Sequence, residues 1–184
     1  MRYRRADVPG ATYFFTVNLA DRQRRLLVEH VDTLRDVMRE VRQRHPFEIE
    51  AIVILPDHLH ALWTLPEGDA DFATRWSLIK AGFSRRLPPV EDIQPSRAAK
   101  RERGIWQRRY WEHLIRNDDD FARHVDYIHW NPCKHRHASQ PMDWPYSSIH
   151  RFVAAGILLP DWGKDESMEH GFGERDDEPF ETAT

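Results

Sequence analysis

The stretch FEIEAIVILPDHLHALWTL, residues 47–65, consists of two apolar runs joined by Pro56-Asp57. Both runs are rich in β-branched and aromatic residues, which favour strands, and a short Pro-Asp link favours a tight connection. Residues 47–55 and 58–65 are therefore predicted to form neighbouring antiparallel strands.

The second of these strands presents different side chains to its two faces, because side chains alternate along a strand. One face carries Leu59, Ala61, Trp63 and Leu65, and the opposite face carries His58, His60, Leu62 and Thr64. The first set is expected to lie in the core. On the other face the two histidines lie side by side, with Cα atoms about 6.5 Å apart by the strand rise.

The flanking sequence adds two more strands and two helices. The strands are expected at ATYFFTVNL (11–19) and GIWQRRYWEHLI (104–115). Apolar residues at helical spacing predict amphipathic helices over 31–45 and over a segment that begins near Phe72 and ends before Pro88.

A third helix is predicted to begin after Asn117 and to end near Asn131-Pro132, because an Asn followed by acidic residues is typical of a helix N-terminus. The order is then β-α-β-β-α-β followed by α. It predicts an α+β, ferredoxin-like fold, an antiparallel sheet with helices on one face and an additional C-terminal helix. Strands 11–19 and 58–65 are central in this topology.

The formal net charge of −3 averages two unlike segments. Residues 164–184 hold eight acidic side chains and have the composition of a disordered tail. The remaining residues, 1–163, carry +3 and are predicted to form one domain, with a basic loop at 88–104. Their basic side chains are clustered, as expected for a polyanion partner, in three groups: Arg2, Arg4 and Arg5; Arg22, Arg24 and Arg25; Arg97, Lys100, Arg101, Arg103, Arg108 and Arg109. Solvated surface charge is the alternative for any one group.

The 184 residues contain one cysteine, Cys133, so an internal disulfide is excluded and a reducing compartment is favoured. Neither a signal-peptide pattern nor a membrane-spanning apolar run is found. A cytoplasmic protein without a membrane partner is expected. A monomer is weakly favoured, because no dimerisation element stands out.

His58 and His60 are candidate ligands of one divalent ion. Two imidazoles without thiolates suit a labile Mg²⁺, Mn²⁺ or Zn²⁺ site with positions open for substrate. Eleven histidines make such pairs common by chance. A second pair, His135 and His137, lies beside Cys133 and offers a less favoured zinc site.

The third helix carries a polar stripe of His124, Tyr127 and Asn131 beside its apolar face. If the helix packs near the open face of the sheet, Tyr127 and Asn131 point toward the histidine pair. A metal that polarises a phosphate oxygen and a phenolate that attacks phosphorus would then give phosphodiester chemistry. The alternative is a half-buried tyrosine that only packs.

Several motifs occur in an order that resembles the REP-associated tyrosine transposases, relatives of the single-strand HUH transposases (HUH, two histidines separated by an apolar residue). They are PDHLH, then WQRRYWEHLIRNDDDFARHVDYIHWNPCKH, then WPYSSIHRFV followed by DWG. The pair of histidines is weak evidence alone, whereas the ordered set is specific. The resemblance covers about residues 2–163.

The resemblance implies a ferredoxin-like HUH domain that cleaves and rejoins single-stranded DNA beside REP hairpins. The reaction is metal-dependent, with Mg²⁺ or Mn²⁺, and passes through a covalent 5′-phosphotyrosine. Matched by motif, the metal ligands are His58 and His60 and the nucleophile is Tyr127. Related enzymes have Gln four residues after the tyrosine, where this chain has Asn131, a shorter amide that either ligates the metal directly or acts through water.

Two further positions bear on the site. Cys133 replaces the usual Val of the family's NPxKH element and is interpreted as a small apolar substitution. Tyr110 is the competing nucleophile, but alternation places it on the opposite side of its strand from His113, so the two cannot both face the site. Tyr127 is preferred.

DNA recognition is assigned to basic and aromatic residues of the body. Arginines neutralise phosphates, and Trp106 or Trp111 stacks on an unpaired base of the REP guide sequence. The predicted DNA-contacting residues are Arg2, Arg4, Arg5, Trp106, Arg108, Arg109, Trp111 and His113. Trp63, Trp76 and Trp144 are expected in the core.

Two alternative functions stay open at this point. One is a ferredoxin-like module that binds nucleic acid without cutting it. The other is a metal-dependent hydrolase in which the histidines activate water and Tyr127 only orients the phosphate.

Overall fold

Four strands form one antiparallel sheet in the computed structural model, which describes residues 7–89 and 103–164. The strands are β1 (Thr12–Asn18), β2 (Glu48–Ile54), β3 (His58–Thr64) and β4 (Trp111–Leu114). Their order is β2-β3-β1-β4, with β1 antiparallel to both β3 and β4 and with β2 antiparallel to β3. The predicted ferredoxin-like topology, with β1 and β3 central, is confirmed.

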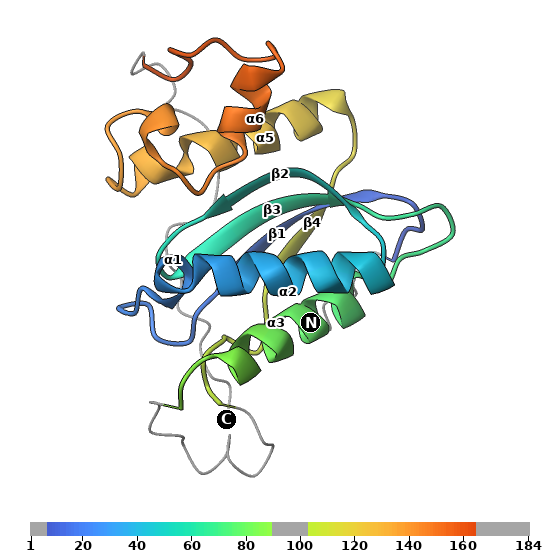
Figure 1. Ribbon diagram of the computed structural model, residues 1–184. Helices are drawn as coiled ribbons and strands as arrows, with labels where there is room; N and C mark the ends of the chain where they lie inside the picture. Colours follow the sequence, from blue (N-terminus) through green and yellow to red (C-terminus); the bar gives the residue numbers. More distant parts are fainter. Residues whose placement is uncertain (1–6, 90–102, 165–184) are drawn as a thin grey trace, which may run out of the picture.

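Helices cover both faces of this sheet (Figure 1). One face carries α2 (Val31–Arg44) and α3 (Phe72–Arg86), and the opposite face carries α5 (Asp118–Lys134) and α6 (Ile149–Ala154). The short elements α1 (Leu26–Glu29), η1 (Pro141–Asp143) and α6 were not predicted. Elements of three to six residues are too short to give a periodic signal.

The larger core lies between the sheet and α2 and α3. Leu59, Ala61 and Trp63 of β3 are all fully buried there, as alternation predicted. Trp63 stacks on Trp76 of α3 at a centroid distance of 4.1 Å. The prediction that these two tryptophans are core residues is therefore confirmed, and Trp144 is also buried, on the other face.

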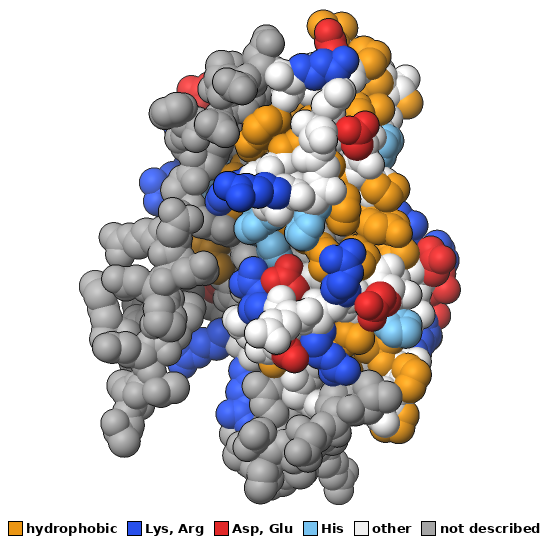
Figure 2. All heavy atoms as spheres, turned by 90° about the vertical axis from the view of Figure 1, so that its left-hand side faces the viewer, with side chains coloured by type: hydrophobic (Ala, Val, Ile, Leu, Met, Phe, Trp, Pro, Cys, Tyr) orange, Lys and Arg blue, Asp and Glu red, His pale blue; other side chains and the backbone are white. Residues whose placement is uncertain are grey.

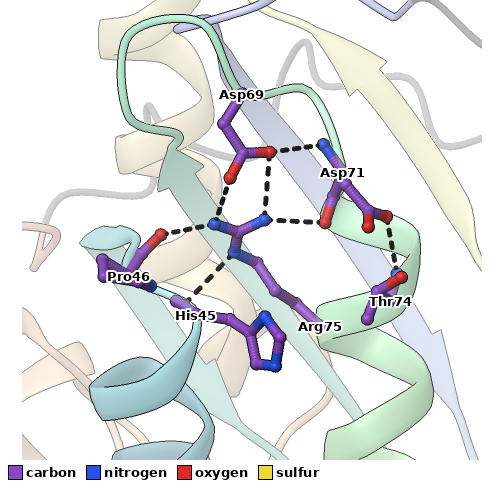
Figure 3. Close-up of polar contacts among 6 residues, drawn as sticks. All are labelled: His45, Pro46, Asp69, Asp71, Thr74 and Arg75. Carbon is purple, nitrogen blue, oxygen red and sulfur yellow. Dashed lines mark hydrogen bonds and ion pairs between the residues drawn. The ribbon is translucent and has the colours of Figure 1, made fainter.

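A buried arginine fixes the loop between β3 and α3 (Figure 3). Arg75, 3% exposed, forms an ion pair with Asp69 at 2.6 Å and donates to the carbonyl of Pro46 at 2.6 Å. Asp71 caps α3 by accepting from the backbone N–H of Thr74 at 2.9 Å. This network joins the start of α3 to the chain between α2 and β2 and so stabilises the helix layer. None of its residues belongs to the histidine pair.

A second core lies under α5, on the face that carries the histidines. Leu62 of β3 and Phe14 of β1 pack there against Val125 and Ile128 of α5. Leu62 alternates with His60, so the histidine-bearing face is partly apolar and needs a cover. The face is therefore not open along these strands, because α5 shields it from solvent.

Two predicted boundaries are wrong. The predicted strand 104–115 is regular only over Trp111–Leu114, because Gly104 has a positive φ of 75° and Trp106 makes only an isolated bridge with Leu19. Helix α5 passes through Pro132 and ends at Lys134, because a proline near a helix end removes only one backbone donor. The Asn117 side chain caps α5 as predicted, accepting from the N–H of Asp120 at 2.8 Å.

Some predictions concern residues outside the described ranges. These are most of the basic loop (90–102), nearly all of the acidic tail (165–184), and Arg2, Arg4 and Arg5. Over residues 7–89 and 103–164, no helix is long and apolar enough to cross a bilayer.

A buried histidine joins α5 to the outer edge of the sheet. Ser148 donates its backbone N–H to the carbonyl of Ile52 in β2, and its hydroxyl lies 2.9 Å from Nε2 of His129. His129 is fully buried. That burial, together with the positive charges of Arg151 and His150, lowers the pKa of His129 to about 4.

We expect the free energy of unfolding to decrease as the pH is lowered, because His129 is buried in its neutral form. Its folded pKa is depressed, so the stabilisation is complete above the unfolded pKa of about 6.5 and is lost as pH falls toward 4. Between pH 7.5 and 5 this one group should lower the free energy of unfolding by about 2 kcal/mol. Urea denaturation of wild type and His129→Gln at both pH values measures it. Equal pH dependence in the two proteins would contradict the assignment.

Candidate active site

Strand β3 positions the two histidines, and both are buried. His58 is 3% exposed and His60 is fully buried, with their rings 5.0 Å apart at 85°. Nδ1 of His60 lies 2.9 Å from the hydroxyl of Thr16 on β1. Burial, followed by the charge of His58, lowers the pKa of His60 well below its ordinary value. His60 is therefore a neutral imidazole at pH 7, which is the form that binds metal.

Asp57 orients His58 from the turn that precedes β3. Its carboxylate accepts from Nδ1 of His58 at 2.8 Å and is also paired with Arg22. Burial alone would raise the pKa of Asp57, but His58 and Arg22 outweigh it and hold that pKa well below its usual range. A carboxylate on Nδ1 directs Nε2 toward a metal, an arrangement common around histidine ligands.

Helix α5 brings Tyr127 to the histidines. Its ring lies 5.1 Å from the ring of His60 at 75° and 5.8 Å from the ring of Phe14. The side chain is only 5% exposed. Helix α5 and strand β3, about 70 positions apart in sequence, thus place a phenol next to the imidazole pair. The polar stripe of the helix predicted this approach.

Asn131 lies one turn further along the same helix and is fully buried. Within residues 7–89 and 103–164, neither its amide oxygen nor its amide nitrogen has a hydrogen-bond partner. Burying an unsatisfied amide costs about 1–3 kcal/mol, so such groups usually meet a ligand, an ion or water. This observation fits an amide that completes a metal site with His58 and His60.

A third histidine reaches this site from the end of α5. The ring of His135 lies 4.9 Å from that of His58, and its pKa is lowered by desolvation and by the charge of His58. Sequence reasoning placed His135 only in a zinc alternative. The approach follows from α5 running past Pro132, which the sequence did not predict.

The zinc alternative is not supported. Among the described residues, three metal-ligating side chains converge in one group, and it does not include Cys133, His135 or His137. The ring of His137 instead stacks on Trp144 at a centroid distance of 5.4 Å. Burial and the charge of Asp143 raise the pKa of Cys133 to about 11, which disfavours the thiolate that zinc requires. Cys133 is an ordinary partly buried side chain.

The group that converges consists of His113, Asp120 and His124. Hydrogen bonds among these residues explain why their side chains lie close together. One oxygen of Asp120 accepts from Nε2 of His113 at 2.9 Å and from the N–H of Arg116 at 3.0 Å. Nδ1 of His124 donates to the backbone carbonyl of Asp120 at 2.7 Å. Because these bonds engage the ligand atoms, we interpret the group as a rigid support for α5 and β4.

Beside this group three rings are nearly parallel. Trp111 stacks on His113 at 5.7 Å and 6°, and His113 stacks on His124 at 4.8 Å and 17°. Trp111 ends the stack and is 45% exposed. Its position fits the predicted role of stacking on an unpaired base.

The stacking role predicted for Trp106 is wrong. This ring is 7% exposed, packs against Phe83 of α3 and donates its indole N–H to the carbonyl of Lys80 at 3.2 Å. Tyr110 also packs into the core on the α3 side, whereas His113 lies on the α5 side. The structure thus agrees with excluding Tyr110 as the nucleophile.

The surface around the site is charged. Arg108 and Arg109 are exposed next to β4. On the face that Figure 2 turns to the viewer, histidine side chains lie together, bordered by Lys or Arg and by acidic side chains.

Comparisons with known proteins identify relatives of this chain. No family model matches the chain. A REP-associated tyrosine transposase of Escherichia coli is 45% identical over 173 residues, 94% of this chain and 96% of the relative. A Haemophilus influenzae protein provisionally given the same name is 45% identical over 168 residues, 91% of this chain and 96% of the relative. A solved structure, a REP-associated tyrosine transposase bound to a REP hairpin, superposes with a TM-score of 0.77 at 45% identity over 90% of this chain and 92% of the other.

Proposed function

Because this chain belongs to the REP-associated tyrosine transposases, we propose that it cleaves and rejoins single-stranded DNA beside REP hairpins, with Tyr127 as the nucleophile. The observation that carries the proposal is the approach of the Tyr127 ring to within 5.1 Å of the His60 ring in a buried site. A phenol that only packed would not need to lie beside two oriented, metal-competent imidazoles.

A divalent cation would be held by His58, His60 and the amide of Asn131, and we propose Mg²⁺ or Mn²⁺ because the family resemblance implies it, with water and phosphate oxygens completing the coordination. The fit rests on the neutral form of His60 and on the buried, unsatisfied amide of Asn131. When bound, such an ion polarises a phosphate oxygen. Asp57 and Thr16 hold the two rings in place through Nδ1.

The chain's own residues then perform the transfer. The Tyr127 hydroxyl loses its proton to solvent, and the phenolate oxygen forms a bond to phosphorus while the bond from phosphorus to the 3′ oxygen breaks. The 3′ oxygen takes a proton from water. Rejoining is the reverse reaction, in which a 3′ hydroxyl attacks the phosphotyrosine.

DNA would be held beside this site by exposed groups. Trp111 would stack on an unpaired base, with His113 behind it and Asp120 fixing the His113 ring. Arg108 and Arg109 would contact phosphates, and Arg2, Arg4 and Arg5 are retained as proposed contacts.

The test is to incubate the full chain with a labelled REP hairpin oligonucleotide and Mg²⁺ or Mn²⁺. We expect a protein–DNA adduct on a denaturing gel, absent with a chelator, and peptide mass spectrometry that places the nucleotide on Tyr127. Cleavage without an adduct would favour the hydrolase, and binding without cleavage would favour the binding module. An adduct on Tyr110 would overturn the nucleophile assignment.

A further inference from the structure

Asn18 is the last residue of β1 and lies directly opposite His58 of β3 in the antiparallel register. Residues opposite each other in such a pair point to the same face of the sheet, with Cα atoms about 4.5–5.5 Å apart. Two positions back along β1, Thr16 lies opposite His60, and its hydroxyl is 2.9 Å from Nδ1 of that ring. The side chain of Asn18 therefore lies on the histidine face of the sheet, beside His58.

The amide oxygen of Asn18 is buried, although the residue as a whole is partly exposed. Among the described residues, no group donates a hydrogen bond to this oxygen. The backbone around it is fixed, because the Asn18 carbonyl accepts from the N–H of Gln107 at 3.0 Å and the N–H of Leu19 donates to the carbonyl of Asp57 at 2.8 Å. Burying an amide oxygen without a partner is unfavourable, so the position calls for a cation or a hydrogen-bond donor.

From this arrangement we propose that Asn18 is a further ligand of the divalent ion, so that two imidazoles and two amide oxygens surround it. The inference rests on the proposed metal site of His58, His60 and Asn131. Asn131 belongs to α5 and Asn18 to β1, so the two amides come to the histidine pair from different elements. Over residues 7–89 and 103–164, both carry a buried amide oxygen that accepts no hydrogen bond. Carbonyl oxygens are ligands that Mg²⁺ and Mn²⁺ prefer.

The chemistry of an amide oxygen narrows its partner. It binds cations or accepts hydrogen bonds, whereas the oxygens of a phosphodiester are themselves acceptors, so the Asn18 oxygen does not pair with DNA phosphate. Its place beside His58 favours the ion over a donor on the DNA, because Asp57 engages Nδ1 of His58 and directs Nε2 toward the metal. An octahedral ion with four protein ligands retains open positions for water and for an oxygen of the scissile phosphate.

The test is calorimetric titration of Mn²⁺ into the metal-free, full-length protein, in wild type, Asn18→Leu and Asn18→Asp. Leu has a similar size but no oxygen, and we expect it to weaken Mn²⁺ binding by about 10-fold or more. Asp places an anionic oxygen at the same position, and we expect it to tighten binding by about 10-fold. Thermal unfolding without metal checks the fold, and Asn18→Leu should be no less stable than wild type because it removes an unsatisfied buried oxygen.

The matched control is Thr12→Val, on the same face of β1 but at its opposite end, about 20 Å away by the strand rise. The Thr12 hydroxyl is bonded to that of Thr64 at 2.8 Å, so the variant removes a polar group from the same strand without reaching the proposed site. Mn²⁺ binding should be unchanged in this variant.

Wild-type Mn²⁺ affinity in Asn18→Leu would overturn the proposal. If only Asn18→Asp bound more tightly, the added charge would explain it and Asn18 would not be a ligand. Weaker binding of the REP hairpin by Asn18→Leu at unchanged Mn²⁺ affinity would instead assign the oxygen to a donor on the DNA. The adduct assay tests the proposed function separately: a wild type that binds Mn²⁺ through Asn18 but forms no adduct would refute the function and support this ligand.

Discussion

Tyr127→Phe is expected to abolish adduct formation and cleavage, because the phenyl ring has no oxygen to attack phosphorus. Removing a nucleophile in a covalent mechanism lowers the rate by about 10⁴-fold or more, which is below detection in a gel assay. The ring contacts with His60 and Phe14 are retained, so the fold should persist. The lost contact with Lys134 should cost about 1 kcal/mol or less.

The matched variant is Tyr110→Phe, which removes a phenol oxygen on the other face of the sheet. It should form adduct at the wild-type rate. Binding of the REP hairpin should survive in Tyr127→Phe, which separates lost chemistry from lost recognition. An adduct that persists in Tyr127→Phe and disappears in Tyr110→Phe would refute the site described above.

His58→Ala is expected to weaken binding of Mn²⁺ by at least about 100-fold and to lower cleavage in parallel. Asp57→Asn, which leaves the ligand but removes the carboxylate that orients it, should have a smaller effect of about 10- to 100-fold. Raising the Mn²⁺ concentration should recover part of the activity of Asp57→Asn. Calorimetric titration of Mn²⁺ into the metal-free protein measures the binding directly.

His137→Ala is the control for the loss of a nearby histidine. His137 is exposed, and its ring is 6.2 Å from that of His135. Unchanged Mn²⁺ binding in this variant and weakened binding in His58→Ala would locate the ion at the β3 pair. If His58→Ala bound Mn²⁺ as well as wild type does, the assignment of the metal ligands would be refuted.

The sequence predicted the histidine pair and the phenol because strong local rules apply there. Alternation along the strand predicts the face on which His58 and His60 lie, and the Asn117 cap sets the start of the helix that carries Tyr127. Neither prediction needs knowledge of tertiary contacts. The position of His135 was missed because it depends on α5 continuing past Pro132 to Lys134. The helix continues there because the rest of α5 is already held against the sheet.

Trp106 is a residue whose burial the sequence did not predict. The base-stacking role predicted for it required an exposed ring, but the chain is not in a regular strand before β4 and turns this ring toward Lys80 and Phe83. Alternation predicts a face only where pairing is regular. Residues 105–110 pair only through isolated contacts, so only tertiary packing decides which of their side chains are buried.

The packing of α5 against its own sheet bears on how two DNA ends could be exchanged. Val125 and Ile128 anchor the helix in the second core, and the proposed nucleophile and the proposed metal-binding residues belong to one chain. Such an arrangement leaves the tyrosine little freedom to travel between two reaction centres. We therefore expect the DNA to move: the cleaved 3′ end must vacate the pocket, and another must take its place, while the protein stays still.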